Sequence, residues 1–232
     1  MKKLSIVIPV FNEERTLAKL LAAVSAVSLP NIEKEIVIVE DASTDKTKAI
    51  LKNLPSTYKV FYQGINQGKG AAIRRGFKEV TGDYIIVQDA DLEYDPEEYP
   101  VILAPLLDGR ADVVYGSRFV GDKPHRVLFF WHSVGNKFLT LFSNIMTDLN
   151  LTDMETCYKA FTREALDKIK NELVSNRFGI EPEITARIAK ENLRIYEVGI
   201  SYAGRTYAEG KKINWKDGVS AIWSILKFNL FG

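Results

Sequence analysis

Short apolar segments separate longer amphipathic ones along the first half of the chain. These segments are continuous and rich in Val and Ile, rather than alternating in polarity, which is typical of parallel strands covered on both faces. A similar segment recurs further along the chain. We therefore predict strands at Leu4–Val10, Glu35–Val39, Tyr58–Tyr62, Tyr84–Gln88 and Asp112–Tyr115, with a further strand around Ile195–Tyr202.

Apolar residues between the predicted strands recur at helical spacing. The clearest case runs from Leu17 to Val27, and shorter helices are predicted near Ala49–Leu54 and Ala72–Val80. Repeated strand–helix units produce right-handed crossovers and a parallel sheet. We expect an α/β fold with a mostly parallel, Rossmann-like central sheet flanked by helices. Its ligands should bind beyond the carboxyl ends of the strands.

Length and composition indicate a soluble globular protein. The chain has 232 residues, of which 46% are hydrophobic and 26% charged, and its formal net charge is +1. These values suit one domain with a large core, and they offer no global field that would attract nucleic acid. The single cysteine excludes an intrachain disulfide framework. We find no signal peptide and no uncharged apolar stretch of the ~18 residues that a spanning helix needs, so we expect a cytoplasmic protein.

Charge is distributed unevenly along the chain. The stretch from Thr81 to Asp112 contains nine acids and one base. Two flanking stretches, Arg118–Lys137 and residues 204–232, each carry three more bases than acids. Such an arrangement can hold a cation and an anionic substrate side by side, although chance clustering on a solvated surface explains the charge pattern equally well.

Polar residues follow the first four predicted strands, in the segments Phe11–Glu14, Glu40–Asp45, Gly64–Gly70 and Asp89–Glu93. Asn12 and Asp41 could simply cap helices. Asp89 and Asp91 are harder to explain structurally, because two acids at the end of a core strand repel each other unless a cation lies between them. Carboxylate oxygens suit Mg²⁺ or Mn²⁺, so this pair predicts a divalent metal site.

The glycine-rich segment after the third strand fits neither of two common phosphate-binding motifs. Ile73 stands where a dinucleotide fingerprint needs Gly or Ala, and Gly70 stands where a P-loop needs Ser or Thr. What remains is a glycine turn in which backbone N–H groups and Lys69 could meet phosphate at a helix N-terminus.

Together these segments resemble the family 2 glycosyltransferases of the GT-A fold. The resemblance rests on IVIPVFNEE, VEDASTDKT, NQGKGAAIRRG, DADLEYDPEE and YGSRF, in this order and spacing. Downstream, TDMETCYKAF, IEPEITARIAK and YAGRTYAEGKKINWKDG resemble the branch that contains dolichol-phosphate mannosyltransferase and related polyprenyl-phosphate sugar transferases. The resemblance covers nearly the whole chain. It implies an inverting transfer of mannose or glucose from GDP-mannose or UDP-glucose.

The resemblance also implies roles for particular residues. Within one domain, residues 1–116 would bind the nucleotide sugar, residues 117–212 the acceptor, and residues 213–232 would form an amphipathic helix. A metal would lie on Asp89, Asp91 and Glu93, and catalysis would depend on Asp89, Asp91, Arg118 and Arg205. The residues expected to contact the nucleotide sugar are Pro9, Asn12, Glu13, Glu40, Asp41, Asp45, Gly68, Lys69, Asp89, Ala90 and Asp91.

Basic residues in the second half are expected to bind the acceptor phosphate, because guanidinium groups match phosphate bidentately. The resemblance assigns this role to Arg118, Arg126, Arg205 and Lys211. Three further acids could each be a general base or could orient a neighbouring Arg or Lys, and the sequence leaves both roles open: Asp153, Glu181 and Glu183.

Two aromatic and basic stretches, Val127–Phe142 and Val219–Phe231, predict helices that lie in a membrane interface. With the family's lipid acceptors, they suggest transfer to a dolichyl or undecaprenyl phosphate by a protein peripheral on the cytoplasmic face of the membrane. Three alternatives remain open, namely transfer to a sugar or protein hydroxyl, a non-catalytic nucleotide-sugar binder and a sugar-1-phosphate nucleotidyltransferase.

Overall fold

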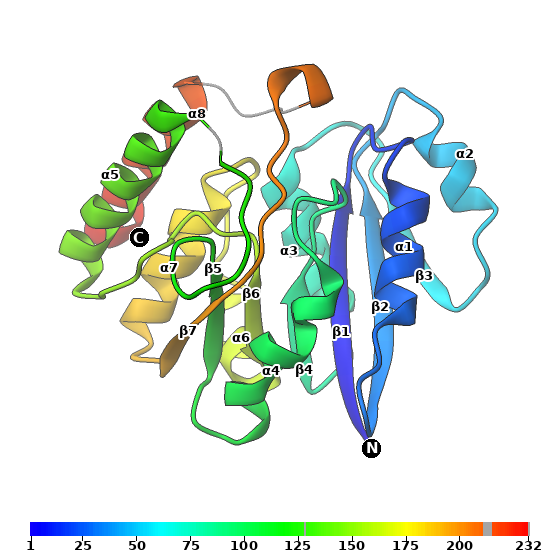
Figure 1. Ribbon diagram of the computed structural model, residues 1–232, viewed down its shortest axis with the longest axis horizontal. Helices are drawn as coiled ribbons and strands as arrows, with labels where there is room; N and C mark the ends of the chain where they lie inside the picture. Colours follow the sequence, from blue (N-terminus) through cyan, green and yellow to red (C-terminus); the bar gives the residue numbers. More distant parts are fainter. Residues whose placement is uncertain (128, 211–214, 232) are drawn as a thin grey trace.

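A single seven-stranded sheet forms the centre of the computed structural model, which describes residues 1–127, 129–210 and 215–231 (Figure 1). The strand order is β3-β2-β1-β4-β6-β5-β7. All pairings are parallel except those of β6 with its neighbours β4 and β5. The strands are β1 (Lys2–Val10), β2 (Ile32–Glu40), β3 (Tyr58–Tyr62), β4 (Tyr84–Val87), β5 (Val113–Ser117), β6 (Lys159–Thr162) and β7 (Ile195–Gly199).

This sheet confirms the mostly parallel α/β fold, and it contains every predicted strand. The sequence did not reveal β6, because its two apolar residues lie between Lys159 and Thr162 and do not form a continuous apolar segment. The residues of β6 pair antiparallel with Tyr84–Ile86 on one side and with Val113–Tyr115 on the other. Leu4–Ile8 of β1, Glu35–Glu40 of β2 and all of β4 are buried, as predicted, whereas β3 lies at the sheet edge and none of its residues is buried, contrary to the expectation that it is covered on both faces.

Helices cover both faces of the sheet (Figure 1). α3 packs on β1 so closely that a Cβ atom at Gly76 would lie 2.4 Å from Val7 Cγ1. The helices α4, α6 and α7 were not predicted. The helices are α1 (Leu17–Ala26), α2 (Thr47–Lys52), α3 (Lys69–Glu79), α4 (Tyr99–Leu107), α5 (Phe130–Thr147), α6 (Arg163–Ile169), α7 (Ile180–Lys190) and α8 (Trp215–Leu230), with short 3₁₀ helices η1 (Pro96–Glu98) and η2 (Tyr207–Glu209).

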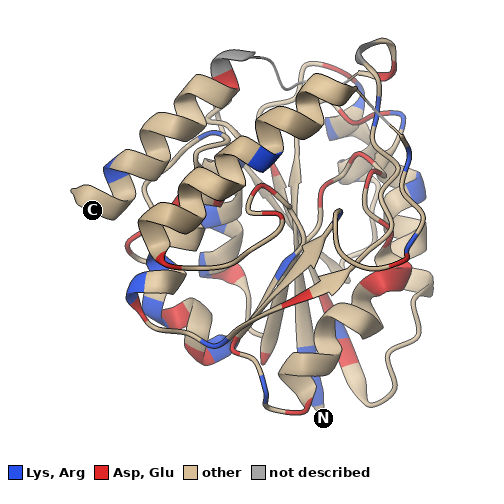
Figure 2. Cartoon of the chain, turned by 60° about the vertical axis from the view of Figure 1, so that its left-hand side comes forward, with Lys and Arg blue, Asp and Glu red and all other residues tan. Residues whose placement is uncertain are grey.

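The helices α5 and α8 confirm the two predicted amphipathic segments. They lie side by side, and both also contact α7 (Figure 2). In Figure 2 they come forward as two long helices with few charged residues. Within the described parts of the chain, no helix has the length and hydropathy needed to cross a bilayer.

Candidate active site

A pocket of about 840 Å³ opens at the carboxyl ends of β1, β2 and β4, where ligands of parallel sheets bind. Its other walls come from α5, α7 and α8 and from the segment after β7. It is therefore bounded by both halves of the chain. Of the predicted site residues, it brings together Pro9, Glu13, Asp41, Gly68, Lys69, Asp89, Ala90, Asp91, Glu93, Arg118 and Arg205.

Asp41 fixes the glycine-rich loop at the edge of this pocket. Its carboxylate accepts hydrogen bonds from the backbone N–H groups of Gln67 and Gly68, both at 2.7 Å, and from the side-chain amide of Asn66 at 3.0 Å. Burial raises the pKa of Asp41, although these amide bonds oppose the rise. Gly68 has a φ of 100°, a left-handed conformation that glycine adopts without strain. Asp41 therefore shapes the loop that leads into α3.

Three residues predicted to contact the nucleotide sugar, Asn12, Glu40 and Asp45, do not line the pocket. Asn12 accepts a hydrogen bond from the backbone N–H of Thr44 at 2.8 Å, and Asp45 accepts one from Thr47 at 2.9 Å. Glu40 is fully buried and accepts from the N–H of Ser43. Asn12 and Asp45, which also accepts from the backbone N–H of Glu14, therefore join the loops after β1 and β2, whereas Glu40 braces the loop after β2 alone.

The predicted pair of acids, Asp89 and Asp91, lies in the pocket, and each acid is bound to a cation. Lys69 Nζ lies 2.8 Å from Asp89 Oδ2. Arg205 lies 2.9 Å from Asp91 Oδ2 and 3.3 Å from Glu93 Oε1. Burial, together with the negative charges of Asp89 and Glu93, raises the pKa of Asp91 to about 7, although Arg205 opposes this. Arg205, expected at the acceptor, is therefore bound to the carboxylates expected to hold the metal.

The chemistry of these carboxylates fits a hard divalent cation. Their crowding raises the pKa of Asp91, and a cation would relieve that repulsion. Among the residues that the structure describes, no group of three or more His, Cys, Asp or Glu side chains is arranged to hold a metal ion. Mg²⁺ is typically held by one or two carboxylates together with substrate phosphates. Asp89 and Asp91 would suit that role, although each binds a basic side chain in this structure, whereas both carboxylate oxygens of Glu93 already accept hydrogen bonds, from Tyr202 and Arg205.

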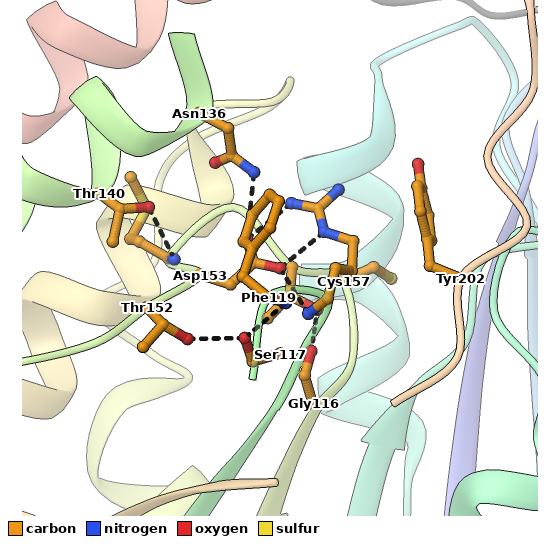
Figure 3. Close-up of polar contacts among 12 residues, drawn as sticks. Gly116, Ser117, Phe119, Asn136, Thr140, Thr152, Asp153, Cys157 and Tyr202 are labelled. Atoms are coloured by element: carbon orange, nitrogen blue, oxygen red, sulfur yellow. Dashed lines mark hydrogen bonds and ion pairs between the residues drawn. The ribbon is translucent and has the colours of Figure 1, made fainter. Parts of the chain in front are cut away.

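After β5, Arg118 lines the pocket and forms a bidentate pair with Asp153. Its Nε lies 2.6 Å from Asp153 Oδ2 and its second guanidinium nitrogen 2.7 Å from Oδ1. Asn136 on α5 donates to the same carboxylate at 3.3 Å, so Asp153 lies between α5 and the loop after β5 (Figure 3). Asp153 is fully buried. Of its two open roles, base or orienting group, the structure shows the second.

Glu181 and Glu183, the other two candidate bases, are also bound to other groups of the protein. Glu181 lies 2.5 Å from the buried Nζ of Lys159 and 3.5 Å from that of Lys69. Glu183 accepts hydrogen bonds from the backbone N–H groups of Val174 and Ser175 at 2.8 and 2.7 Å. Glu181 therefore orients two lysines, and Glu183 holds the loop before α7.

Arg126, another residue predicted to bind the acceptor phosphate, lies outside the pocket lining. Arg126 forms an ion pair with Glu209 at 2.8 Å and donates to the carbonyl of Gly204 at 3.0 Å. It therefore fastens the segment after β7 to the loop after β5. Lys211 lies outside the described residues.

Comparison with known proteins identifies the family of this chain. The family model described as glycosyl transferase family 2 matches residues 5–170. The chain belongs to glycosyl transferase family 2. A solved structure of glucosyl-3-phosphoglycerate synthase from Mycobacterium tuberculosis, in complex with Mn²⁺, UDP and phosphoglyceric acid, has a TM-score of 0.76 to this chain at 19% sequence identity. The structural match covers 100% of this chain and 80% of the synthase chain. This likeness confirms the GT-A fold.

Curated family 2 relatives include two enzymes named for dolichol phosphate. A dolichol-phosphate mannosyltransferase of Pyrococcus furiosus is 28% identical over 91% of this chain and 60% of its own length. A dolichyl-phosphate beta-glucosyltransferase of Trichomonas vaginalis is 28% identical over 98% of this chain and 73% of its own. A low-salt glycan biosynthesis hexosyltransferase of Haloferax volcanii is 31% identical over 98% of this chain. The chain spans 60% and 53% of the Pyrococcus and Haloferax enzymes, respectively.

Several residues of this family 2 pocket were not predicted. Arg177 lines it beside Gly68, and Asn136 and His132 reach it from α5. Glu155 lines it from the loop between α5 and β6. Glu155 lies inside TDMETCYKAF, one of the segments that carry the family resemblance, but only the folded chain shows that Glu155 lines the pocket.

Proposed function

We propose that the chain transfers mannose or glucose from a nucleotide sugar, GDP-mannose or UDP-glucose, to a polyprenyl phosphate, with inversion at the anomeric carbon. One observation carries this proposal. The pocket has a charged wall at the strand ends, while α5 and α8 close it with one face and expose apolar residues on the other. An acceptor with a phosphate head and an apolar chain fits such a boundary.

The charged wall suits the nucleotide diphosphate. The loop held by Asp41 ends at Lys69, the first residue of α3, where a helix N-terminus favours anions. Burial lowers the pKa of Lys69, but Asp89 and Glu181 outweigh it and raise the pKa well above its usual value. Lys69 therefore stays charged and can donate to a diphosphate oxygen as the sugar departs. A divalent cation on Asp89 and Asp91 would add electrostatic stabilisation of the leaving diphosphate.

The part of the pocket lined by Arg118 suits the acceptor. Arg118 is oriented by both oxygens of Asp153, so its guanidinium is fixed where it lines the pocket. A phosphate oxygen is a nucleophile without a general base, since a phosphate monoester carries about −1.5 to −2 charges at pH 7. The engagement of Asp153, Glu181 and Glu183 with other groups agrees with an acceptor of this kind.

The outer faces of α5 and α8 would contact the membrane that holds the lipid. Phe130, Trp131, Phe138 and Trp223 are exposed, with 77% and 61% of the two tryptophans accessible to solvent. Trp131 also lines the pocket, so the pocket adjoins this apolar surface. Aromatic residues with nearby lysines are typical of helices that lie in an interface. We place the protein peripherally on the cytoplasmic face of the membrane.

A transfer assay with defined acceptors tests the function. The protein is incubated with GDP-mannose or UDP-glucose, with a short-chain prenyl phosphate or simple sugar alcohols, and with Mn²⁺ or EDTA. We expect a glycosylated prenyl phosphate by mass spectrometry, formed only with metal. Asp91→Ala should abolish it, whereas Asp122→Ala, which removes an exposed acid outside the pocket lining, should not.

The other outcomes identify the alternatives. Sugar alcohols glycosylated in place of the lipid would establish a hydroxyl acceptor. Binding of a nucleotide sugar without transfer to any acceptor would indicate a non-catalytic binder. Transfer at the full rate in EDTA would refute the metal site.

A further inference from the structure

Glu155 is the acid of the pocket for which the structure shows no partner. Its Oε1 is shielded from solvent, and no residue in the described parts of the chain forms a hydrogen bond or ion pair with this carboxyl group. The residue as a whole is half-buried and lines the pocket. A buried ionised oxygen without a partner costs several kcal/mol, whereas a neutral carboxyl costs far less.

The charges around Glu155 come from four parts of the fold. Glu181 on α7 and Asp153 in its own loop disfavour ionisation, whereas Lys159 on β6 and Arg118 after β5 favour it. Both favourable cations are already bound by those same two acids. The balance, led by burial, raises the pKa of Glu155 to about 7. From α5, the neutral amide of Asn136 and the ring of His132 also line the pocket.

The charge of the whole pocket also opposes an ionised Glu155. Among the residues that the structure describes, eight Asp and Glu side chains line the pocket, against four Lys and Arg side chains. The proposed reaction brings in a charged diphosphate and an acceptor phosphate of about −1.5 to −2 charges. Each further negative charge on the wall repels both substrates, and a proton on Glu155 removes one such charge.

Resting on the proposed function, we propose that Glu155 binds the acceptor as a neutral carboxylic acid and donates a hydrogen bond to the acceptor phosphate. Arg118 then supplies the positive charge on the same phosphate, and Glu155 supplies a donor without adding a charge. Glu155 keeps its proton in this role. The proposed reaction is therefore unchanged: the phosphate oxygen forms a bond to the anomeric carbon, and the bond from that carbon to the nucleoside diphosphate breaks. The acceptor site is therefore selective for an anion and weakens when Glu155 ionises.

The pH dependence of the acceptor KM tests this proposal. A short-chain prenyl phosphate is the acceptor, and the variants are Glu155→Gln, Glu155→Leu and Glu164→Gln, the last an exposed acid on α6 that serves as control. In the wild type, the acceptor KM should rise above pH 7 by up to about tenfold per pH unit, as the neutral acid is lost. Glu155→Gln cannot ionise, so its KM at pH 8.5 relative to pH 6.5 should rise less than that of the wild type, by a factor of up to about 25. Titration of the acceptor phosphate changes the KM of every variant by the same factor, so it cancels when the variants are compared.

Glu155→Leu separates the hydrogen bond from the charge. It removes both, so its acceptor KM at pH 6.5 should exceed that of Glu155→Gln by about tenfold or more, the value of a hydrogen bond to a charged group. The KM of the nucleotide sugar, measured in parallel, should not change and reports that the variants are folded.

Each contrary result has a separate meaning. A pH ratio in Glu155→Gln equal to that of the wild type overturns the neutral-donor role. A loss of kcat of about 10²- to 10⁴-fold in Glu155→Gln, with a wild-type rate that rises with pH, would make Glu155 a general base and overturn it as well. If the wild type transfers nothing to prenyl phosphate at any pH, the proposed function itself has failed.

Discussion

The buried ion pair of Arg118 and Asp153 should contribute strongly to the free energy of unfolding. The variant Asp153→Asn tests this contribution. Asp153 is fully buried, and 15% of the Arg118 side chain is exposed. The amide keeps the size and one acceptor oxygen but removes the charge. Arg118 cannot lose its proton, so its charge would remain without a counter-ion. Removal of one partner of a buried pair costs about 3–5 kcal/mol.

The geometry of the pair places the cost at the lower end of that range. Arg118 lines the pocket, so water can reach part of its guanidinium. We expect the free energy of unfolding to fall by about 3 kcal/mol. For a chain of this length, each kcal/mol lowers Tm by about 2–4 °C, so Tm should fall by about 6–12 °C. Urea unfolding followed by circular dichroism measures the first quantity, and a thermal scan measures the second.

A second bidentate pair in the chain provides the control. Arg194 binds Asp112 with the same fork geometry, at 3.0 and 2.7 Å, but 58% of the Arg194 side chain is exposed. Water can replace the lost partner there, so Asp112→Asn should change stability much less than Asp153→Asn. The double variant Asp153→Asn with Arg118→Met should recover much of the loss, because it leaves no buried charge unpaired. Equal effects of Asp153→Asn and Asp112→Asn would refute the reasoning.

Two further predictions concern the membrane and acid stability. Trp131→Ser with Trp223→Ser should reduce sedimentation with anionic liposomes at low salt, because both side chains are largely exposed on the apolar face, and unchanged sedimentation would refute a membrane role for it. Burial would raise the pKa of Glu35, but hydrogen bonds from Lys59, Ser5 and Thr81 outweigh burial and lower it from 4.5 to about 2. This carboxylate therefore stabilises the fold above pH 4.5 and loses its effect as the pH falls towards 2. Unfolding of Glu35→Gln should show a weaker pH dependence in that window, and an unchanged one would contradict the assignment.

The continuous apolar segments were sufficient to predict the strands of the parallel sheet. A strand covered on both faces must be apolar throughout, so burial is visible in the composition of each segment. The carboxyl ends of parallel strands lie at one edge, so the sequence also indicated that Asp41, Lys69, Asp89 and Asp91 would come together. All four residues line the pocket.

The antiparallel strand and the helix α7 were visible only in the structure. β6 has four residues, and its position between β4 and β5 depends on pairing with partners far along the chain. The sequence of α7 contains four charged residues, yet Glu181 and Glu183 are buried, where Lys159 binds Glu181 and backbone N–H groups of a neighbouring loop bind Glu183. No local pattern encodes a partner that distant segments supply.

Only the tertiary structure determines which charged side chains of the site bind one another. Arg205 and Asp91 are 114 residues apart, and only the return of the segment after β7 across the strand ends brings them within 2.9 Å. The same packing gives cations to Asp153 and Glu181, and among the described residues it gives none to Glu155. The energy of a charged side chain depends on its burial and on the groups within a few ångströms of it. Residue type and spacing can therefore nominate such a group, but its role follows from neighbours that only the folded chain assembles.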